Sequence, residues 1–144
     1  MYRSCLPKRL QGKRILIVED ELLIAMEFEQ NLIAAGALVV GPAGTSPKAL
    51  DLLARERPDA AVLDLNLDGE RPVALAQALV RQQVPFVVVT GYCNCDEAPF
   101  SLARQVKKPA DASELIQALC QTMGLSPECD SSGIDEGADA IRLS

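Results

Sequence analysis

The stretch ILIVED, residues 15–20, is a run of four large apolar residues that stops on two acids. The pattern returns in AAVLD at 60–64 and in FVVVT at 86–90, and a weaker run that closes at Val106 is followed by KKP at 107–109. Continuous apolar runs of this length are typical of strands buried on both faces of a parallel sheet. The carboxyl ends of parallel strands share one edge, so we expect the polar residues after these runs to meet in one crevice.

The residues expected in the crevice carry carboxyl, hydroxyl and ammonium groups, and they are Glu19, Asp20, Asp64, Thr90 and Lys107 or Lys108. Adjacent side chains at a strand end point in opposite directions, so only one lysine can face the crevice. Asp64 offers a carboxylate nucleophile that can take a phosphoryl group. Three crowded acids repel one another, and a hard divalent cation with oxygen ligands relieves that repulsion, which makes Mg²⁺ the natural cofactor.

Amphipathic segments separate the apolar runs, which predicts strand-helix-strand units around a mainly parallel α/β sheet. Leu22, Met26 and Ile33 repeat at helical spacing, and a short strand follows at 38–40. Ser46 is expected to cap a second helix, because a proline follows it in the first turn. Further helices are predicted after Pro72 and from Asp111 to Gly124, whereas residues 91–101 break helical periodicity, so any helix there is short.

Length and composition narrow the class of protein. The chain has 144 residues, enough for one domain, and no run approaches the roughly 20 apolar residues of a membrane-spanning helix. Residues 1–12 form a basic arm without interleaved aromatics, in a chain of net charge −6, so we expect neither nucleic acid nor membrane as a partner. The five cysteines lack framework spacing, which favours reduced thiols and a cytoplasmic location. Cys93 and Cys95 are too close for a zinc or redox pair.

Taken together, residues 13–123 resemble a response-regulator receiver domain. An acidic pair, an aspartate, a threonine and Lys-Pro after successive strands make up the family's signature, in the family's order. The resemblance implies a flavodoxin-like (βα)5 three-layer sandwich, with a parallel five-stranded sheet in the order 2-1-3-4-5. The basic arm 1–12 then precedes the domain, and residues 124–144 form an acidic tail whose composition predicts disorder.

Site roles follow from the resemblance by position. Asp64 would be the phosphoacceptor, with Thr90 and Lys108 binding phosphoryl oxygens. Asp20, Asp64 and the backbone carbonyl of Asn66 would ligate Mg²⁺, and Glu19 would act through water. Lys108, directly before the proline, occupies the family position, and Lys107 would face solvent. The family often has a cis peptide before this proline.

The resemblance also suggests how the chain would signal. It implies a receiver that is not an enzyme with turnover and that accepts a phosphoryl group from a histidine kinase or a phosphotransfer protein. Because only the acidic tail follows the last predicted helix, we expect a stand-alone receiver. The signal would reach a target through the face formed by strands four and five. Gln105 stands where many receivers carry an aromatic switch residue, so activation is expected to rearrange residues 91–100 instead. Residues 85–92, PFVVVTGY, resemble the Phe-Ala-Thr-Gly-Tyr motif of a proteobacterial subgroup, with Val88 and Val89 in place of Phe-Ala.

Two other classes stay open at this point. A receiver-like adaptor that never carries phosphate would bind its partners constitutively. Two departures from the family pattern leave this hypothesis open: Gln105, and Ala110 at a position after the proline where an aromatic residue is common. The segment DLNL at 64–67 faintly resembles the opening motif of haloacid dehalogenase-like phosphohydrolases, although Asn66 replaces the second aspartate of that motif.

Overall fold

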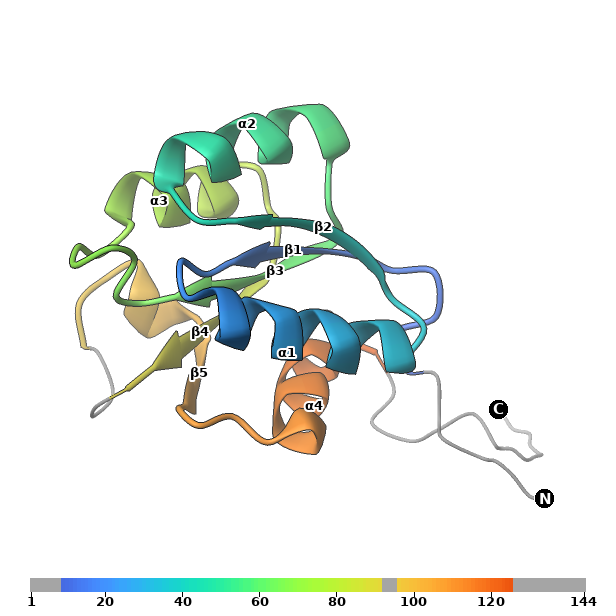
Figure 1. The fold of residues 1–144 in the computed structure, drawn as a ribbon. Helices are drawn as coiled ribbons and strands as arrows, with labels where there is room; N and C mark the ends of the chain where they lie inside the picture. The colour runs from blue at the N-terminus through green and yellow to red at the C-terminus, as the bar shows by residue number, and fades with distance from the viewer. Residues whose placement is uncertain (1–8, 92–95, 126–144) are drawn as a thin grey trace, which may run out of the picture.

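A five-stranded parallel sheet forms the centre of the protein (Figure 1). The computed structural model describes residues 9–91 and 96–125. The strands lie in the order β2-β1-β3-β4-β5, which confirms the predicted flavodoxin-like arrangement. Their bounds are β1 Arg14–Val18, β2 Leu38–Ala43, β3 Ala60–Asp64, β4 Phe86–Thr90 and β5 Arg104–Lys107.

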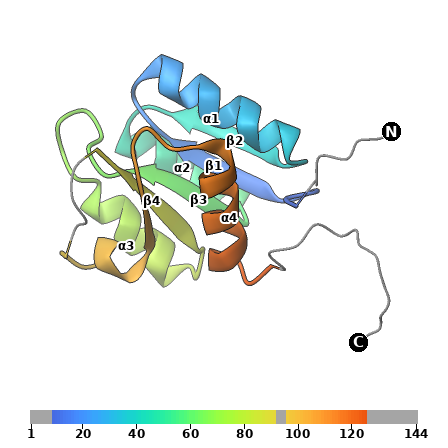
Figure 2. The ribbon, with the colours of Figure 1, turned by 90° about the horizontal axis from the view of Figure 1, so that it is seen from below.

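Helices cover both faces of the sheet. One face carries α1 (Leu22–Ala34) and α4 (Ala112–Thr122), and the other carries α2 (Ser46–Glu56) and α3 (Val73–Arg81), as Figures 1 and 2 show. Between β4 and β5 the described residues contain only a 3-10 turn, η1 (Phe100–Leu102). This turn confirms the expectation that any helix in the crossover would be short.

The central strands are buried from both sides, as their apolar runs predict. Alternate residues of β1 point to opposite faces, so that Ile15 and Ile17 join the core under α1 and α4, while Leu16 and Val18 join the core under α2 and α3. All the residues of β3 and β4 are buried. Each fully buried large apolar side chain contributes roughly 1.5–3 kcal/mol. This burial holds the polar strand ends at fixed positions.

The residues that α1 buries against the sheet are not the periodic apolar residues that predict the helix. Ala25, Phe28 and Leu32 are buried. Leu22 and Ile33, which repeat at helical spacing, are 69% and 55% exposed. The helix is therefore where the sequence predicts it, but part of its apolar surface faces outward.

Two local details also depart from the sequence prediction. The N-cap of α2 is Thr45 and not Ser46, because the Thr45 hydroxyl accepts a hydrogen bond from the amide of Lys48 at 3.3 Å. Within the range assigned to the basic arm, Leu10 is fully buried, and its amide donates to the carbonyl of Ala35 at 3.0 Å. The packed part of the chain therefore includes Leu10.

The remaining general predictions concern the membrane and the cysteines. None of the helices in the described part of the chain is long and apolar enough to cross a bilayer. Cys120 is a buried free thiol whose pKa is raised by burial, although the nearby Arg9 opposes that rise. Cys93, Cys95 and the acidic tail beyond residue 125 lie outside the described residues.

Candidate functional site

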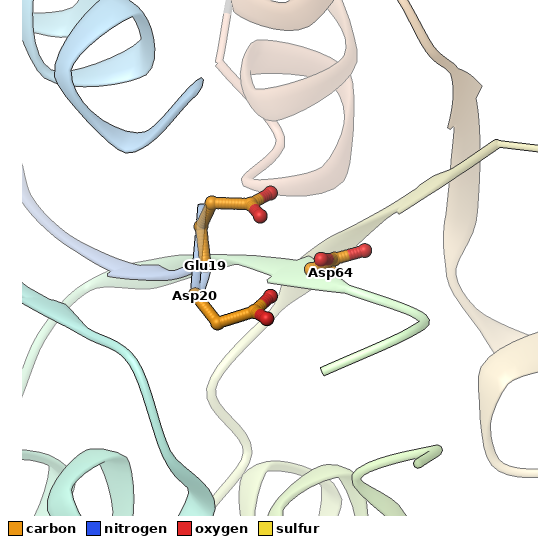
Figure 3. A group of neighbouring side chains, drawn as sticks. All are labelled: Glu19, Asp20 and Asp64. Atoms are coloured by element: carbon orange, nitrogen blue, oxygen red, sulfur yellow. The ribbon is translucent and has the colours of Figure 1, made fainter. Parts of the chain in front are cut away.

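Three acids lie together at the carboxyl edge of the sheet (Figure 3). Glu19 and Asp20 follow β1, and Asp64 is the last residue of β3, the neighbouring strand. One ligand oxygen from each residue lies within 4.8 Å of the other two. Glu19 and Asp64 are buried, whereas Asp20 is exposed. Parallel pairing of β1 with β3 is what brings the predicted acids together.

Lys108 supplies the opposing charge. Its Nζ lies 3.3 Å from Oδ1 of Asp64 and 3.4 Å from Oε1 of Glu19. The Lys108 amide donates to the carbonyl of Thr90 at 2.7 Å, and the Lys108–Pro109 bond is cis. Lys107 is exposed, and side-chain alternation along the strand turns it away from the acids that Lys108 contacts.

Burial and neighbouring charge change the acid-base properties of the cluster. Burial raises the pKa of Glu19 to about 7, and the charge of Asp64 adds to that rise, although the amide of Glu21 and the ammonium of Lys108 oppose it. Burial alone would lower the pKa of Lys108, but Asp64 and Glu19 together raise it above its ordinary value. Lys108 is therefore a permanent cation beside the acids.

Two buried oxygens of the cluster have no hydrogen-bond donor. They are Oε1 of Glu19 and Oδ2 of Asp64. The contact of Lys108 with Glu19 Oε1 is an ion pair without the geometry of a hydrogen bond. Buried carboxylate oxygens without donors are costly, and a small divalent cation satisfies such oxygens directly. The three acids therefore fit a hard cation.

The remaining predicted residues lie around the same cavity, whose volume is about 550 Å³. Thr90 ends β4, is buried and lines this cavity. Asn66 also lines it, and the backbone N–H of Asn66 donates to Oδ1 of Asp64 at 3.1 Å. The structure thus brings Asp20, Asp64, Asn66, Thr90 and Lys108 to one cavity, with Glu19 held against Lys108.

The cavity also includes an arginine that the sequence motifs do not identify. Arg71 lines the cavity and forms an ion pair with Glu97. The position of Arg71, soon after Asp64 and the Asp68-Gly69 turn, signals that it lies near the crevice. The pairing has no signal in the sequence, because the two residues belong to loops 26 positions apart.

A second cavity, of about 490 Å³, lies between the end of α3 and the beginnings of β4 and β5. Its lining is mostly apolar and includes Leu79, Phe86 and Leu102, with Arg104 as its charged residue. It contains no carboxylate. The cavity at the carboxyl edge, in contrast, combines clustered acids with a lysine.

Known proteins share this fold and this sequence pattern. The family model of the response regulator receiver domain matches residues 15–120. The transcriptional regulatory protein PdtaR of Mycobacterium tuberculosis is 29% identical over 112 residues, which are 74% of this chain and 55% of PdtaR. The phyllosphere-induced regulator PhyR of Methylorubrum extorquens is 35% identical over 115 residues, which are 73% of this chain and 43% of PhyR. The chain spans about half the length of these relatives.

Solved structures agree with the fold. PhyR from Brucella abortus has a TM-score of 0.69 at 28% identity, and the match covers 81% of this chain and 50% of PhyR. A CheY-like receiver domain protein from Methanospirillum hungatei also has a TM-score of 0.69 at 28% identity, with 79% of this chain and 95% of that one covered. The chain therefore belongs to the response regulator receiver domain family, a family of signalling proteins.

Proposed function

We propose that this chain accepts a phosphoryl group on Asp64 and passes the signal on by contact with other proteins. The observation that supports this most directly is the position of Lys108, whose Nζ lies 3.3 Å from Asp64 in a cavity that opens at the carboxyl edge of the sheet. An aspartate with a fixed cation beside it suits attack on a phosphoryl donor, because the cation balances the charge that arrives.

The transfer is a displacement at phosphorus. A carboxylate oxygen of Asp64 attacks the phosphorus atom of a phosphohistidine, a P–O bond forms, and the P–N bond breaks. The electron pair of the broken bond stays on the imidazole nitrogen, which leaves as neutral imidazole once it holds a proton from solvent. Lys108 binds one phosphoryl oxygen, and Thr90 donates its hydroxyl to another. The product on Asp64 is an acyl phosphate.

Mg²⁺ is the proposed cofactor. Asp20, Asp64 and the backbone carbonyl of Asn66 would hold it, with Glu19 acting through water. When bound, the ion neutralises negative charge on the phosphoryl oxygens. The fit rests on the three clustered acids and on the two buried oxygens without donors.

The partners follow from the family. A sensor histidine kinase or a phosphotransfer protein would supply the phosphoryl group, and a downstream protein would bind the face formed by β4 and β5. PdtaR, PhyR and the response regulator GacA of Pseudomonas aeruginosa are regulators by name, and each extends well beyond the matched region. We place the receiver unit at residues 13–123, extended at its start by Leu10, between a basic arm and an acidic tail.

The segment from β4 supports a subgroup assignment. Residues 85–92 resemble the Phe-Ala-Thr-Gly-Tyr motif, and PhyR proteins are among the relatives and the structural matches. We propose membership of that proteobacterial subgroup, in which rearrangement after Thr90 replaces an aromatic switch. Gln105 supports this view, because its side-chain amide donates to the carbonyl of Phe100 at 3.4 Å.

Intact mass spectrometry tests the proposal. The protein is incubated with acetyl phosphate in the presence and absence of Mg²⁺, beside an Asp64→Asn variant. We expect one added phosphoryl group that requires Mg²⁺ and is absent from the variant. If no donor yields an adduct, the constitutive adaptor is the better hypothesis. Steady release of phosphate from phosphate esters without an adduct would favour the phosphohydrolase.

A further inference from the structure

The loop after β3 is held rigidly. We define the hairpin loop as residues 65–72. Within it, Leu67 and Glu70 exchange backbone hydrogen bonds of 2.8 and 3.1 Å across Asp68 and Gly69. Both central residues have positive φ, 53° and 83°, as in the tight turns that join antiparallel strands. Leu67 is buried in the core, so the loop presents Arg71 from a fixed base.

Arg71 lies between the cavity and an acidic residue, Glu97. It lines the cavity that contains Asp64 and Lys108, and its Nη1 donates to Oε1 of Glu97. About half of each side chain in this ion pair is exposed, 51% for Arg71 and 55% for Glu97. Exposed ion pairs contribute little to stability and are screened by salt. The guanidinium is therefore held only weakly by its present partner.

Glu97 belongs to the crossover segment, which we define as residues 96–103. Its carbonyl accepts a hydrogen bond from the amide of Ser101 at 3.0 Å, within the turn that buries Phe100. The ion pair with Arg71 thus joins the crossover segment to the hairpin loop beside the cavity. A change at Arg71 reaches this segment directly.

Phosphorylation would change the balance at Arg71. A phosphoryl group on Asp64 adds dianionic oxygens to the cavity that Arg71 lines, and a planar guanidinium binds phosphate oxygens by two parallel hydrogen bonds. We propose that Arg71 is a phosphoryl-binding residue that Glu97 holds in reserve, and that phosphorylation moves its guanidinium from Glu97 to the phosphoryl oxygens. This inference rests on the proposed function of Asp64.

The exchange of partners has a consequence for the crossover segment. Once Arg71 has moved, residues 96–99 lose the ion pair that joins Glu97 to the hairpin loop, while Phe100 keeps the segment attached to the core. Added charge at the site thereby changes the mobility of the surface next to β4 and β5. That surface is the proposed target-binding face.

A double-mutant cycle tests the inference. Rates of adduct formation with acetyl phosphate and Mg²⁺ are measured for Arg71→Gln, Glu97→Gln and the double variant. We expect Arg71→Gln to slow the reaction about tenfold, the size of one lost charge-assisted contact. Glu97→Gln should accelerate it about twofold, because Arg71 is then released. The double variant should be as slow as Arg71→Gln alone.

The double variant separates binding from simple charge attraction. It has the same net charge as the wild type, so attraction of the anionic donor alone would restore the wild-type rate, and that result would overturn the proposal. Equal rates in all four proteins would overturn it as well. Arg55→Gln and Asp51→Asn, which break an exposed ion pair on α2, are matched controls and should leave the rate unchanged.

Hydrogen exchange gives the second readout. We expect amide exchange in residues 96–102 to increase when the wild type is phosphorylated, and to be high already in unphosphorylated Glu97→Gln. Exchange that is unchanged by phosphorylation in the wild type would contradict the release. If the wild type forms an adduct but the cycle fails, only the role of Arg71 is refuted. If the wild type forms no adduct, both proposals fail.

Discussion

The two loops that the Arg71–Glu97 ion pair joins are built in opposite ways. The hairpin loop has a two-residue turn closed by reciprocal backbone hydrogen bonds and a buried leucine at its base. The crossover segment has a 3-10 turn in place of a helix, and Phe100 is its fully buried anchor. The hairpin loop is closed by backbone hydrogen bonds across its turn, whereas the crossover segment is attached to the core through buried Pro99 and Phe100. A rigid loop at the cavity can hold the chemistry constant while the surface segment joined to it changes.

Phe100→Ala is the substitution with the largest expected effect, and it tests whether Phe100 anchors the crossover segment. We expect a loss of about 3–5 kcal/mol in the free energy of unfolding, since a large buried side chain leaves a cavity. Urea denaturation measures this loss. Leu102→Ala is the matched control in the same turn, and its effect should be small because Leu102 is 73% exposed. A loss below about 1 kcal/mol for Phe100→Ala would mean that the segment is barely attached.

Lys108→Met has the next largest expected effect and tests the role of the lysine beside the buried acids. The change leaves Glu19 and Asp64 without their cation, and Lys108 is partly buried, so we expect a loss of about 2 kcal/mol without Mg²⁺. Adding Mg²⁺ should recover more stability in this variant than in the wild type. Thermal unfolding with and without a chelator measures both. Lys107→Met, at the exposed neighbouring position, should change little, and equal losses in the two variants would contradict the assignment.

Glu19→Gln should have a smaller effect of opposite sign. The unfolded chain releases the Glu19 proton near pH 4.5, whereas the folded protein keeps it to about pH 7, so stability falls as the pH rises through this window. Without Mg²⁺, we expect the variant to be about 1 kcal/mol more stable than the wild type at pH 8, and equally stable at pH 4. Urea midpoints across this range check the difference. A difference independent of pH would show that burial of the Glu19 charge is not its cause.

Gly69→Ala has the smallest expected effect and sharpens the contrast between the loops. Gly69 has a φ of +83° with open space at the Cβ position, so the cost, about 1 kcal/mol, comes from the backbone alone. Gly91, which follows β4, also has open space but no positive φ. Gly91→Ala should therefore leave stability unchanged or increase it slightly. Chemical denaturation of both variants measures the contrast, and equal effects would remove it.

Much of this architecture follows from short-range sequence features. Apolar runs that end on polar residues predict the strands and bring Asp64 and Thr90 to one edge. Strand alternation allows only one of the two lysines to face the crevice, and the family pattern selects Lys108. These predictions succeed because burial on both faces of a sheet leaves a continuous apolar signature.

Other features depend on long-range packing and have no such signature. The spacing of Leu22 and Ile33 predicts a helix but not which side meets the sheet, and the side that does carries Ala25, Phe28 and Leu32. The sequence predicts that Leu10 belongs to a solvated arm, because a single leucine among basic residues forms no periodic apolar pattern. The Arg71–Glu97 pair arises only when two loops meet in space.

The buried turn at Leu10 determines where other proteins can be joined to this one. Leu10 precedes β1, and Thr122, at the end of α4, lines a cavity together with the first residues of β4 and β5. Strands of five residues separate that edge from Asp64 by about 16 Å. A fluorescent reporter fused before Leu10 or after Leu125 would therefore leave the entrance to the phosphorylation site open. The reporter would then lie at the edge of the sheet opposite the phosphorylation site.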